Sequence, residues 1–356
     1  MYDIITIGSA TQDVFLRSKA WETKEDPRSP TGLNACLPLG SKVPIEDLHF
    51  TTGGGATNAA VTFARLGRLR AATVCEIGKD DPGAAAVLAD LRRERVDTTL
   101  IHRDPKLPTA YSVVLVMGAG ERTILVYRGA SQQLDAKRVS WPRLRAKRFY
   151  ITSLGGDLAL MRKILAHAGR IGARVVWNPG GAEIAQGWAR IAPLIAGCDV
   201  LNLNREEAAQ LTGLDPKNLK GILTKLWSAR SPACAECGPD CDACAALSGV
   251  YTLVTDGAGG AYAHNGHTTW HIASRNLNAV NATGAGDAFG SAFFLGLDLG
   301  VRKNELGYSL DYALRLAMAN AEGVIMHMGA KTGILSKVPS RVALARYRIR
   351  QLSASR

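Results

Sequence analysis

The chain has 356 residues, 47% of them hydrophobic and 21% charged, and a formal net charge of +12 at pH 7. This is the composition of an ordinary globular protein with a sizeable core. No apolar run is long enough to cross a bilayer, and the first residues, MYDIITIGSA, begin as a strand rather than as a signal peptide. We therefore expect a cytoplasmic protein without a membrane partner.

The positive charge has two interpretations. Clustered Lys and Arg would suit a nucleic-acid partner, because they neutralise phosphates. The basic residues are spread along the chain, however, and the local concentrations WPRLRAKRF and SRVALARYRIRQLSASR lack the interleaved aromatics of a single-strand binder. We favour a surface suited to anionic small molecules, with no nucleic-acid partner, and we expect the second concentration to form an amphipathic closing helix.

Short apolar runs alternate with helical patterns along most of the chain. The strand-like runs are residues 3–8, 71–78, 148–154, 174–180, 198–204 and 251–257. The helical patterns are residues 56–67, 83–96, 158–172, 184–197, 205–213 and 219–229. This alternation predicts an α/β fold with a mainly parallel sheet covered by helices on both faces. Ligands of such sheets bind beyond the carboxyl ends of the strands, where we expect the site.

Two regions break the alternation. Residues 14–50 are rich in Pro, Lys and Ser and show little regular pattern, whereas residues 109–127 predict a hairpin that turns at GAGE. We expect the two to form a small β lid, from about 14–50 and 103–128, over the strand ends. No linker is long enough to separate two domains, so residues 1–350 are expected to form a single domain.

The first candidate motif is TTGGGATNAAVTFARLG, residues 51–67. Gly54 and Gly55 would let a ligand approach the backbone closely, and Asn58 offers a donor and an acceptor in the first helical turn. The alternative is an ordinary strand-to-helix turn.

The second motif is NLNREEAAQL, in which Asn204 and Glu207 lie three residues apart at the end of a predicted strand. On one face of a starting helix, Glu207 could hold a metal-bound water near a phosphate. The alternative is that Asn204 caps the helix and Glu207 is a first-turn acid, and for this motif alone we favour capping.

The third motif, VTDGAGGAY, places Gly257 and Gly260 after another strand. The segment that follows is strand-like rather than helical, so a Rossmann fingerprint is not indicated. No Gly-Lys-Ser/Thr tripeptide occurs, so a Walker A loop is absent as well. The phosphates of any nucleotide would need a different cradle.

That cradle is best supplied by NATGAGDAFGSAF, residues 281–293. Gly284, Ala285 and Gly286 allow a tight turn with exposed N–H groups, and the apolar spacing that follows predicts a helix beginning near Asp287. A helix N-terminus attracts anions. An acid at such a place makes chemical sense if Asp287 takes a proton from a nucleophile beside a bound phosphoryl group.

Taken together and in this order, the motifs resemble the ribokinase/PfkB family of sugar and nucleoside kinases over nearly the whole chain. The resemblance implies a ribokinase-like three-layer fold, ATP and Mg²⁺ as cofactors, and Asp287 as the general base beside an anion hole at Gly284, Ala285 and Gly286. It implies that Asp13, Gly54, Gly55 and Asn58 bind the acceptor, that Asn204 and Glu207 place Mg²⁺ and phosphate, with Glu207 acting on the metal indirectly, and that Thr255, Gly257, Gly260 and Asn320 bind the nucleotide.

One departure from the family pattern concerns a monovalent cation. Members often have Asp-Thr where this chain has Asn281 and Ala282, and that Asp helps to hold an activating cation. Asn keeps an oxygen ligand but loses the charge, so activation by potassium is an open question.

The cysteines form a second departure. Cys234, Cys237, Cys241 and Cys244, in CAECGPDCDAC, look like an insertion at about residues 230–247. Four thiolates at this spacing could bind one structural Zn²⁺. The alternatives are two disulfides or four free thiols. Cys75 and Cys198 lie in apolar stretches and are expected in the core.

We predict an ATP-dependent kinase that phosphorylates a hydroxymethyl group of a ribose- or fructose-like sugar. A nucleoside kinase acting on an adenosine-like acceptor is the alternative within the family, and a non-catalytic metabolite sensor with a kinase fold is the alternative outside it. The partner is therefore a small sugar or nucleoside, and the lid could also serve as the interface of a homodimer.

Overall fold

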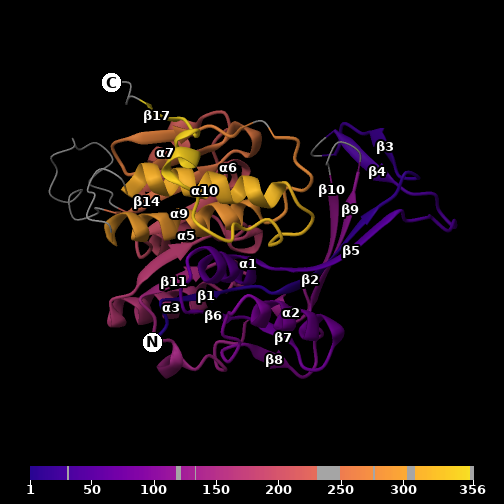
Figure 1. Cartoon of the computed structure of the whole chain (residues 1–356), viewed down its shortest axis with the longest axis horizontal. Coiled ribbons are helices and arrows are strands. Elements are labelled where there is room, and N and C mark those ends of the chain that lie inside the picture. The colour runs from indigo at the N-terminus through magenta and orange to yellow at the C-terminus, as the bar shows by residue number, and fades with distance from the viewer. Residues whose placement is uncertain are drawn as a thin grey trace.

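The computed structural model describes residues 1–29, 32–117, 122–132, 134–230, 249–275, 277–302 and 309–352. Within them, a central sheet is covered by helices on both faces, and a second, smaller sheet projects from one side of this body (Figure 1). The predicted α/β class with a mainly parallel sheet is confirmed.

Within the described residues, the central sheet has nine strands. In spatial order they are β17 (Ile349–Leu352), β16 (Thr269–Ile272), β15 (Ala261–His264), β14 (Tyr251–Thr255), β13 (Val200–Asn204), β12 (Arg174–Trp177), β11 (Arg148–Ile151), β1 (Ile4–Ile7) and β6 (Ala71–Val74). The strands from β14 to β6 pair in parallel, whereas β14, β15, β16 and β17 pair antiparallel. The parallel strands therefore end at one common edge, where a ligand is expected.

Side chains alternate between the two faces of this sheet and so feed two separate cores. Phe149 and Ile151 of β11 join one cluster, while Tyr150 between them joins the other.

The helices of the described residues are α1 (Gly55–Val61) with its π-helical continuation Thr62–Leu66, α2 (Pro82–Arg93), α3 (Leu158–Ile171), α4 (Gly181–Ile184), α5 (Trp188–Ile195), α6 (Arg205–Thr212), α7 (Leu219–Ser228), α9 (Ala285–Arg302), α10 (Ser309–Ile325) and α11 (Arg341–Ala345).

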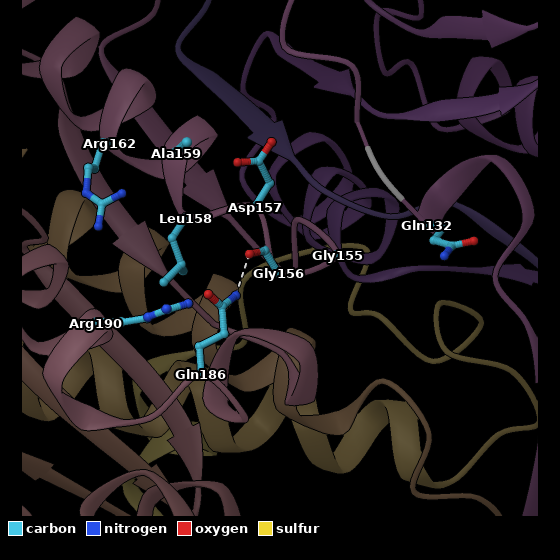
Figure 2. Close-up of a pocket in the computed structure, with 9 residues that line it drawn as sticks. All are labelled: Gln132, Gly155, Gly156, Asp157, Leu158, Ala159, Arg162, Gln186 and Arg190. Atoms are coloured by element: carbon cyan, nitrogen blue, oxygen red, sulfur yellow. Dashed lines mark hydrogen bonds between the residues drawn. The ribbon is translucent and has the colours of Figure 1, made fainter.

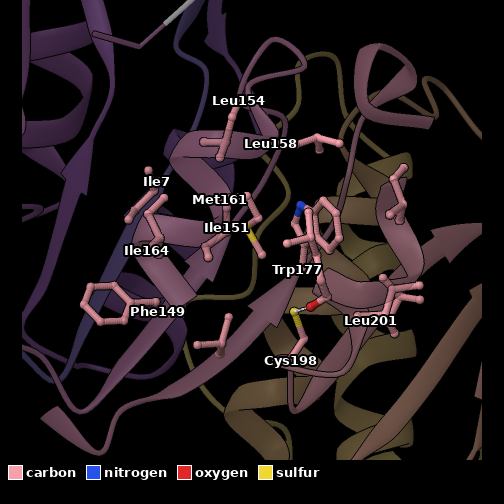
Figure 3. Packing of buried hydrophobic residues seen from close by; sticks show 14 of the residues in the cluster. Ile7, Phe149, Ile151, Leu154, Leu158, Met161, Ile164, Trp177, Cys198 and Leu201 are labelled. Atoms are coloured by element: carbon pink, nitrogen blue, oxygen red, sulfur yellow. Dashed lines mark hydrogen bonds between the residues drawn. The ribbon is translucent and has the colours of Figure 1, made fainter. Parts of the chain in front are cut away.

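Helices α3, α5, α6 and α7 cover the face to which Phe149 and Ile151 point, and α9 and α10 cover the opposite face. Figure 3 shows the first core, where Met161 and Ile164 of α3 lie near Ile151 of the sheet. Cys198 belongs to this core and Cys75 to a third cluster, so the prediction that both are core cysteines is confirmed. Burial raises the pKa of each of these two thiols to about 12.

Two predicted helices differ in the structure. The pattern over residues 184–197 predicts one helix, but α4 ends at Ile184 and α5 begins only at Trp188, because Gly187 between them has a φ of 82°. The basic C-terminal segment forms the short helix α11 and then strand β17, which pairs with β16. Tertiary pairing to an open sheet edge thus overrides the helical pattern there.

The smaller sheet has the order β10 (Arg122–Tyr127), β9 (Ala110–Val116), β2 (Thr11–Arg17) and β5 (Asp47–Gly53). We call this four-stranded sheet the lid. Strands β9 and β10 form the antiparallel pair expected from the sequence, and the predicted turn at residues 118–121 lies outside the described residues. Strands β2 and β5 come from the ends of the region that shows little pattern. That region also contains the hairpin of β3 (Glu22–Glu25) and β4 (Leu33–Cys36). A further two-stranded pair joins β7 (Glu76–Gly78) to β8 (His102–Asp104).

Among the residues that the structure describes, none of the helices combines the length and apolar character needed to cross a bilayer.

Candidate active site

Helix α9 starts against the carboxyl edge of the sheet from a tight turn. Gly284 has a φ of 81°, and a Cβ there would lie 2.6 Å from the Cβ and 2.8 Å from the carbonyl oxygen of Ala330. At Gly286, by contrast, a Cβ would meet nothing within 4 Å. The first-turn N–H groups have no partner within the helix. The turn is therefore closed on its Gly284 side and open on its Gly286 side, where an anion could approach the backbone.

Asp287 lies in this first turn and is held by a residue from a distant part of the chain. Asn58, in α1, donates from Nδ2 to Asp287 Oδ2 over 2.8 Å. Burial raises the pKa of the Asp287 carboxyl, and the hydrogen bond from Asn58 opposes that shift. The structure therefore brings together the residue predicted as general base and one predicted for the acceptor.

A buried polar pair that sequence reasoning missed lies beneath the same turn. Asn202 of β13 donates from Nδ2 to the carbonyl oxygen of Gly286 over 3.3 Å. Gly290 allows this approach, because a Cβ there would collide with Asn202 and lie 2.6 Å from the Tyr150 hydroxyl. Burial and the charge of Asp287 raise the pKa of Tyr150 well above its usual value. The signal in the sequence that could have found this pair was a polar residue at a buried position in each strand, Tyr150 in β11 and Asn202 in β13.

Asp13 lies on lid strand β2, directly after the end of β1. Its Oδ1 accepts a hydrogen bond from Thr11 Oγ1 at 2.9 Å. Burial raises the pKa of this carboxyl, while hydrogen bonds from Thr11 and Ser112 and the charge of Lys331 act against the rise. The site thus contains a second carboxylate that is buried but held by donors.

The glycines at 53–55 are explained by their packing against the segment that contains Asp13. A Cβ on Gly53 would collide with the Asp13 carboxylate, and Gly54 has a φ of 96° with a Cβ position 2.5 Å from the Ser9 carbonyl oxygen. Gly55 donates its N–H to Ser9 Oγ over 3.1 Å. Only glycine allows this turn to lie so close to Asp13.

Asn204 and Glu207 form a complete capping box at the start of α6. Glu207 N donates to Asn204 Oδ1 over 2.7 Å, and Asn204 N donates to Glu207 Oε2 over 2.9 Å. The capping alternative is therefore realised. The Glu207 carboxyl is also affected by the start of α9, because its pKa is raised first by burial and further by the charge of Asp287.

A cavity of about 450 Å³ opens beside the start of α9. It is lined by small and apolar residues with two charged exceptions: Gly257, Ala258, Ser274, Arg275, Leu277, Asn278, Ala279, Ala282, Ala285, Met318, Ala321, Glu322 and Ile325. Of the residues predicted for the nucleotide, Gly257 lines this cavity, whereas Thr255 and Gly260 do not. Gly260 has a structural reason instead, because its φ is 97° and a Cβ would collide with the Ile272 carbonyl.

Asn320 does not line the cavity either. Its side chain is fully buried at 0% exposure. Its Nδ2 donates to the Ala288 carbonyl over 3.0 Å, and its Oδ1 accepts from Leu335 N at 3.0 Å. Both ends of the amide are thus engaged, one in joining α10 to α9 and the other in holding the segment after α10, and the geometry does not favour the predicted contact with a base. Met318, Ala321, Glu322 and Ile325 of the same helix line the cavity instead.

Comparison with known proteins identifies the family. Residues 33–337 match the model described as pfkB family carbohydrate kinase. The chain belongs to the pfkB family.

Its relatives in this family include the ribokinase of Schizosaccharomyces pombe, which is 27% identical over 351 residues covering 96% of each chain. The aminoimidazole riboside kinase of Salmonella typhimurium is 28% identical over 256 residues, 67% of this chain and 70% of that protein. Among solved structures, Arabidopsis thaliana ribokinase complexed with ribose and ATP superposes with a TM-score of 0.67 at 19% identity, over 97% of this chain and 98% of that one. The pfkB protein described here is therefore a sugar kinase with a ribokinase-like fold.

The departure at residues 281 and 282 can be seen in the structure of this pfkB kinase. Asn281 is buried, and its Oδ1 accepts from Thr283 N at 3.1 Å and from Thr283 Oγ1 at 2.9 Å. Ala282 lines the cavity beside α9. The oxygen that replaces the family's carboxylate is thus already used to shape the turn before Gly284.

A second cavity, of about 530 Å³, follows the carboxyl end of β11 (Figure 2). Its lining is Gln132, Gly155, Gly156, Asp157, Leu158, Ala159, Arg162, Gln186 and Arg190. Gln186 donates to the Gly156 carbonyl, which fixes one wall. None of the residues predicted for the pfkB site lines this cavity.

Cys234, Cys237, Cys241 and Cys244 lie outside the described residues. Among the residues that are described, no cluster of three or more His, Cys, Asp or Glu side chains has the geometry of a metal site.

The contrast between Gly284 and Gly286 is testable. Gly284→Ala should lower the free energy of unfolding by about 2–4 kcal/mol, because it combines a left-handed φ with a collision at Ala330. Gly286→Ala should change it by no more than about 1 kcal/mol, in the stabilising direction, because the position is helical and open. Urea unfolding followed by circular dichroism measures both. Equal losses in the two variants would contradict the packing described for this turn.

Proposed function

We propose that this kinase transfers the γ-phosphoryl group of ATP to a hydroxymethyl group of a ribose- or fructose-like sugar, with Asp287 as the general base. The observation that carries the proposal is the meeting of Asp287 and Asn58 at the open N-terminus of α9. A carboxylate beside an anion-binding helix end suits proton removal from a hydroxyl next to a phosphoryl group.

The acceptor side consists of Asp13, Asn58 and the turn at Gly53–Gly55. Asp13 is a hydrogen-bond acceptor, and the glycine turn packs closely against its carboxylate, so that backbone and side-chain polar groups converge on one place. Sugars are recognised by such convergent polar groups on a rigid frame. The ribose bound by the Arabidopsis ribokinase supports this class of acceptor.

The donor side consists of the cavity beside α9 and the turn at Gly284–Gly286. The cavity of about 450 Å³ is lined in part by the small residues Gly257, Ala282 and Ala285, and we assign it to the purine; the ATP in the Arabidopsis structure supports that choice. ATP supplies the transferred phosphoryl group. Asn204 and Glu207 would help to place its Mg²⁺ through water, because the carboxyl of Glu207 is close enough to Asp287 to feel its charge.

In the proposed reaction, the acceptor hydroxyl gives its proton to Asp287 as its oxygen bonds to phosphorus, and the products are a sugar phosphate and ADP. Burial raises the pKa of Asp287 toward the operating pH, which strengthens it as a base. Asn58 keeps Oδ2 oriented through its hydrogen bond. The lid would exclude water and so limit hydrolysis.

The test is phosphate transfer from ATP–Mg²⁺ to a panel of sugars and nucleosides. Asp287→Asn should lower kcat by about 10²–10⁴-fold, because it removes the base but keeps the shape. Asp199→Asn is the matched control, because Asp199 precedes β13 and so lies at the opposite edge of the sheet, where it accepts from Val175 N. Its turnover should stay unchanged. If the native protein binds acceptors but phosphorylates none, it is a sensor; if only nucleosides react, it is a nucleoside kinase.

We also propose that the outer face of the lid joins two copies of the chain. Phe50, Val14, Val113 and Leu125 are directly paired across the four strands and form one apolar row. Asp13 lies in the next row and so points to the other face. At the two ends of this row, on the edge strands, Phe50 and Leu125 are 63% and 56% exposed, whereas Val14 between them is 4% exposed.

Sedimentation velocity tests this homodimer. The native chain should sediment as a dimer, and Leu125→Glu should convert it to a monomer, because a charge would be buried in the apolar row. Val342→Glu is the control, since Val342 is 86% exposed on α11, away from the lid. A native chain that sediments as a monomer, or a Leu125→Glu dimer, would overturn this interface.

For the four cysteines at 234, 237, 241 and 244, the proposal is a structural Zn²⁺ held by four thiolates. Protein purified without chelator should contain about one zinc per chain by atomic emission, and Cys237→Ser should lose most of it. Cys36→Ser, at a half-buried position of the mostly exposed hairpin of β3 and β4, should keep the metal. Metal-free native protein with four titratable thiols in this segment would refute the zinc site.

A further inference from the structure

Lys331 is a buried cation that the proposed reaction does not use. It lies in the segment after α10, and its side chain is only 6% exposed. Its Nζ donates to Asp90 Oδ2 and to Thr52 Oγ1 over 2.7 Å each, and to Thr57 Oγ1 over 3.3 Å. These partners come from α2, from lid strand β5 and from α1. One ammonium group therefore joins three elements that surround the acceptor side.

The residues before Lys331 contact both halves of the site. A Cβ on Gly329 would lie 2.9 Å from Thr51 Cγ2 of the lid, and Ala330 packs against Gly284 of the catalytic turn. Met328 packs on the lid cluster that contains Phe15. The segment 328–331 thus lies between the lid and the start of α9, and its last side chain reaches the acceptor turn.

Lys331 reaches the Gly53–Gly55 turn through two threonines. Thr57 Oγ1 accepts from Lys331 and donates to the Gly53 carbonyl over 2.6 Å and to the Gly54 carbonyl over 3.1 Å. Thr52 Oγ1 accepts from Lys331 and donates to Asp90. The two hydroxyls flank the glycines, so the ammonium fixes the turn on both sides.

The charge of Lys331 also acts on Asp13. It lowers the pKa of the Asp13 carboxyl and so opposes the rise caused by burial. The carboxylates of Asp90, Asp13 and Glu94 in turn oppose the fall that burial imposes on the pKa of Lys331. The remaining charged groups here are paired: Arg93 with Asp90, and Arg65 with Glu94 and with the Lys331 carbonyl. Lys331 is therefore the cation whose charge acts on Asp13.

We propose that Lys331 is a positioning residue for the acceptor, because it holds both the Gly53–Gly55 turn and the Asp13 carboxylate in the form that receives the acceptor hydroxyls. This inference rests on the proposed kinase function, with Asp13 as an acceptor ligand. It assigns Lys331 to acceptor affinity rather than to phosphoryl transfer, since none of its described contacts is to Asp287.

The first experiment compares Lys331→Met with native protein in steady-state turnover. Loss of the charge should raise the acceptor KM about 10–100-fold, as for loss of hydrogen bonds to a charged group. It should lower kcat and raise the ATP KM by less than about threefold, because the interaction acts on binding of the acceptor alone. Lys331→Arg should recover part of the acceptor affinity, since it restores the charge.

The control is Arg148→Met, which breaks another buried ion pair, with Asp298 of α9, at the opposite edge of the sheet. It should lower the melting temperature as Lys331→Met does, yet leave the acceptor KM unchanged. An acceptor KM that is native-like in Lys331→Met, or raised equally in Arg148→Met, would reduce Lys331 to a stabilising residue and overturn the proposal.

Measuring acceptor affinity as a function of pH distinguishes the titration of Asp13 from that of Asp287. Acceptor binding is measured by titration calorimetry in Asp287→Asn protein, with and without Lys331→Met. Without the ammonium, the pKa of Asp13 rises, so acceptor affinity should be lost at a higher pH than in the protein that keeps Lys331. If the pH at which acceptor affinity is lost is the same with and without Lys331→Met, the proposed effect of the Lys331 charge on Asp13 is wrong. A native enzyme that phosphorylates nothing would instead refute the kinase function, which keeps the two failures distinct.

Discussion

The site depends on how closely the first turn of α9 approaches the carboxyl edge of the sheet. Gly284 abuts Ala330, and Gly290 allows Tyr150 and Asn202 to lie directly beneath the helix. Asn58 then bonds Asp287 across 229 residues of chain. A side chain at either glycine would push α9 outward, and both the open N–H groups and the carboxylate would move with it. The remainder of the site is arranged around this helix end.

Carboxylates concentrate at that edge, and the fold keeps them there by pairing each one. Burial raises the pKa of Asp13, Glu207 and Asp287, and each is countered by specific donors: Thr11 and Ser112, the Asn204 backbone, and Asn58. Without these donors, each buried carboxylate would become protonated or would move to a solvent-exposed position. Lys331 belongs to this pattern as the counter-charge on the lid side. In the proposed mechanism these three carboxylates have different roles, although all of them lie at the same edge of the sheet.

The two faces of the lid differ in the side chains that they carry. Asp13 and Ser112 lie on the face that we propose receives the acceptor, whereas Phe50 and Leu125 lie on the opposite face. Because successive residues of a strand point to opposite sides, a single four-stranded sheet can serve both ligand and partner. A homodimer through the outer face would stiffen the sheet that carries Asp13, and so would couple assembly to acceptor binding.

The sequence by itself determined the alternating elements, the lid hairpin, the order of the glycine turns and Asp287, because these signals are local. It predicted Asn320 as a contact to the base, whereas the structure shows Asn320 joining α10 to α9. It favoured capping of α6 at Asn204, but it did not indicate that Glu207 completes the capping box and also lies where the charge of Asp287 raises its pKa. Tyr150, Asn202 and Lys331 were missed altogether. Only the tertiary structure decided these roles, because a buried polar side chain acquires its function from its partners, and Lys331 meets Thr52 across 279 residues.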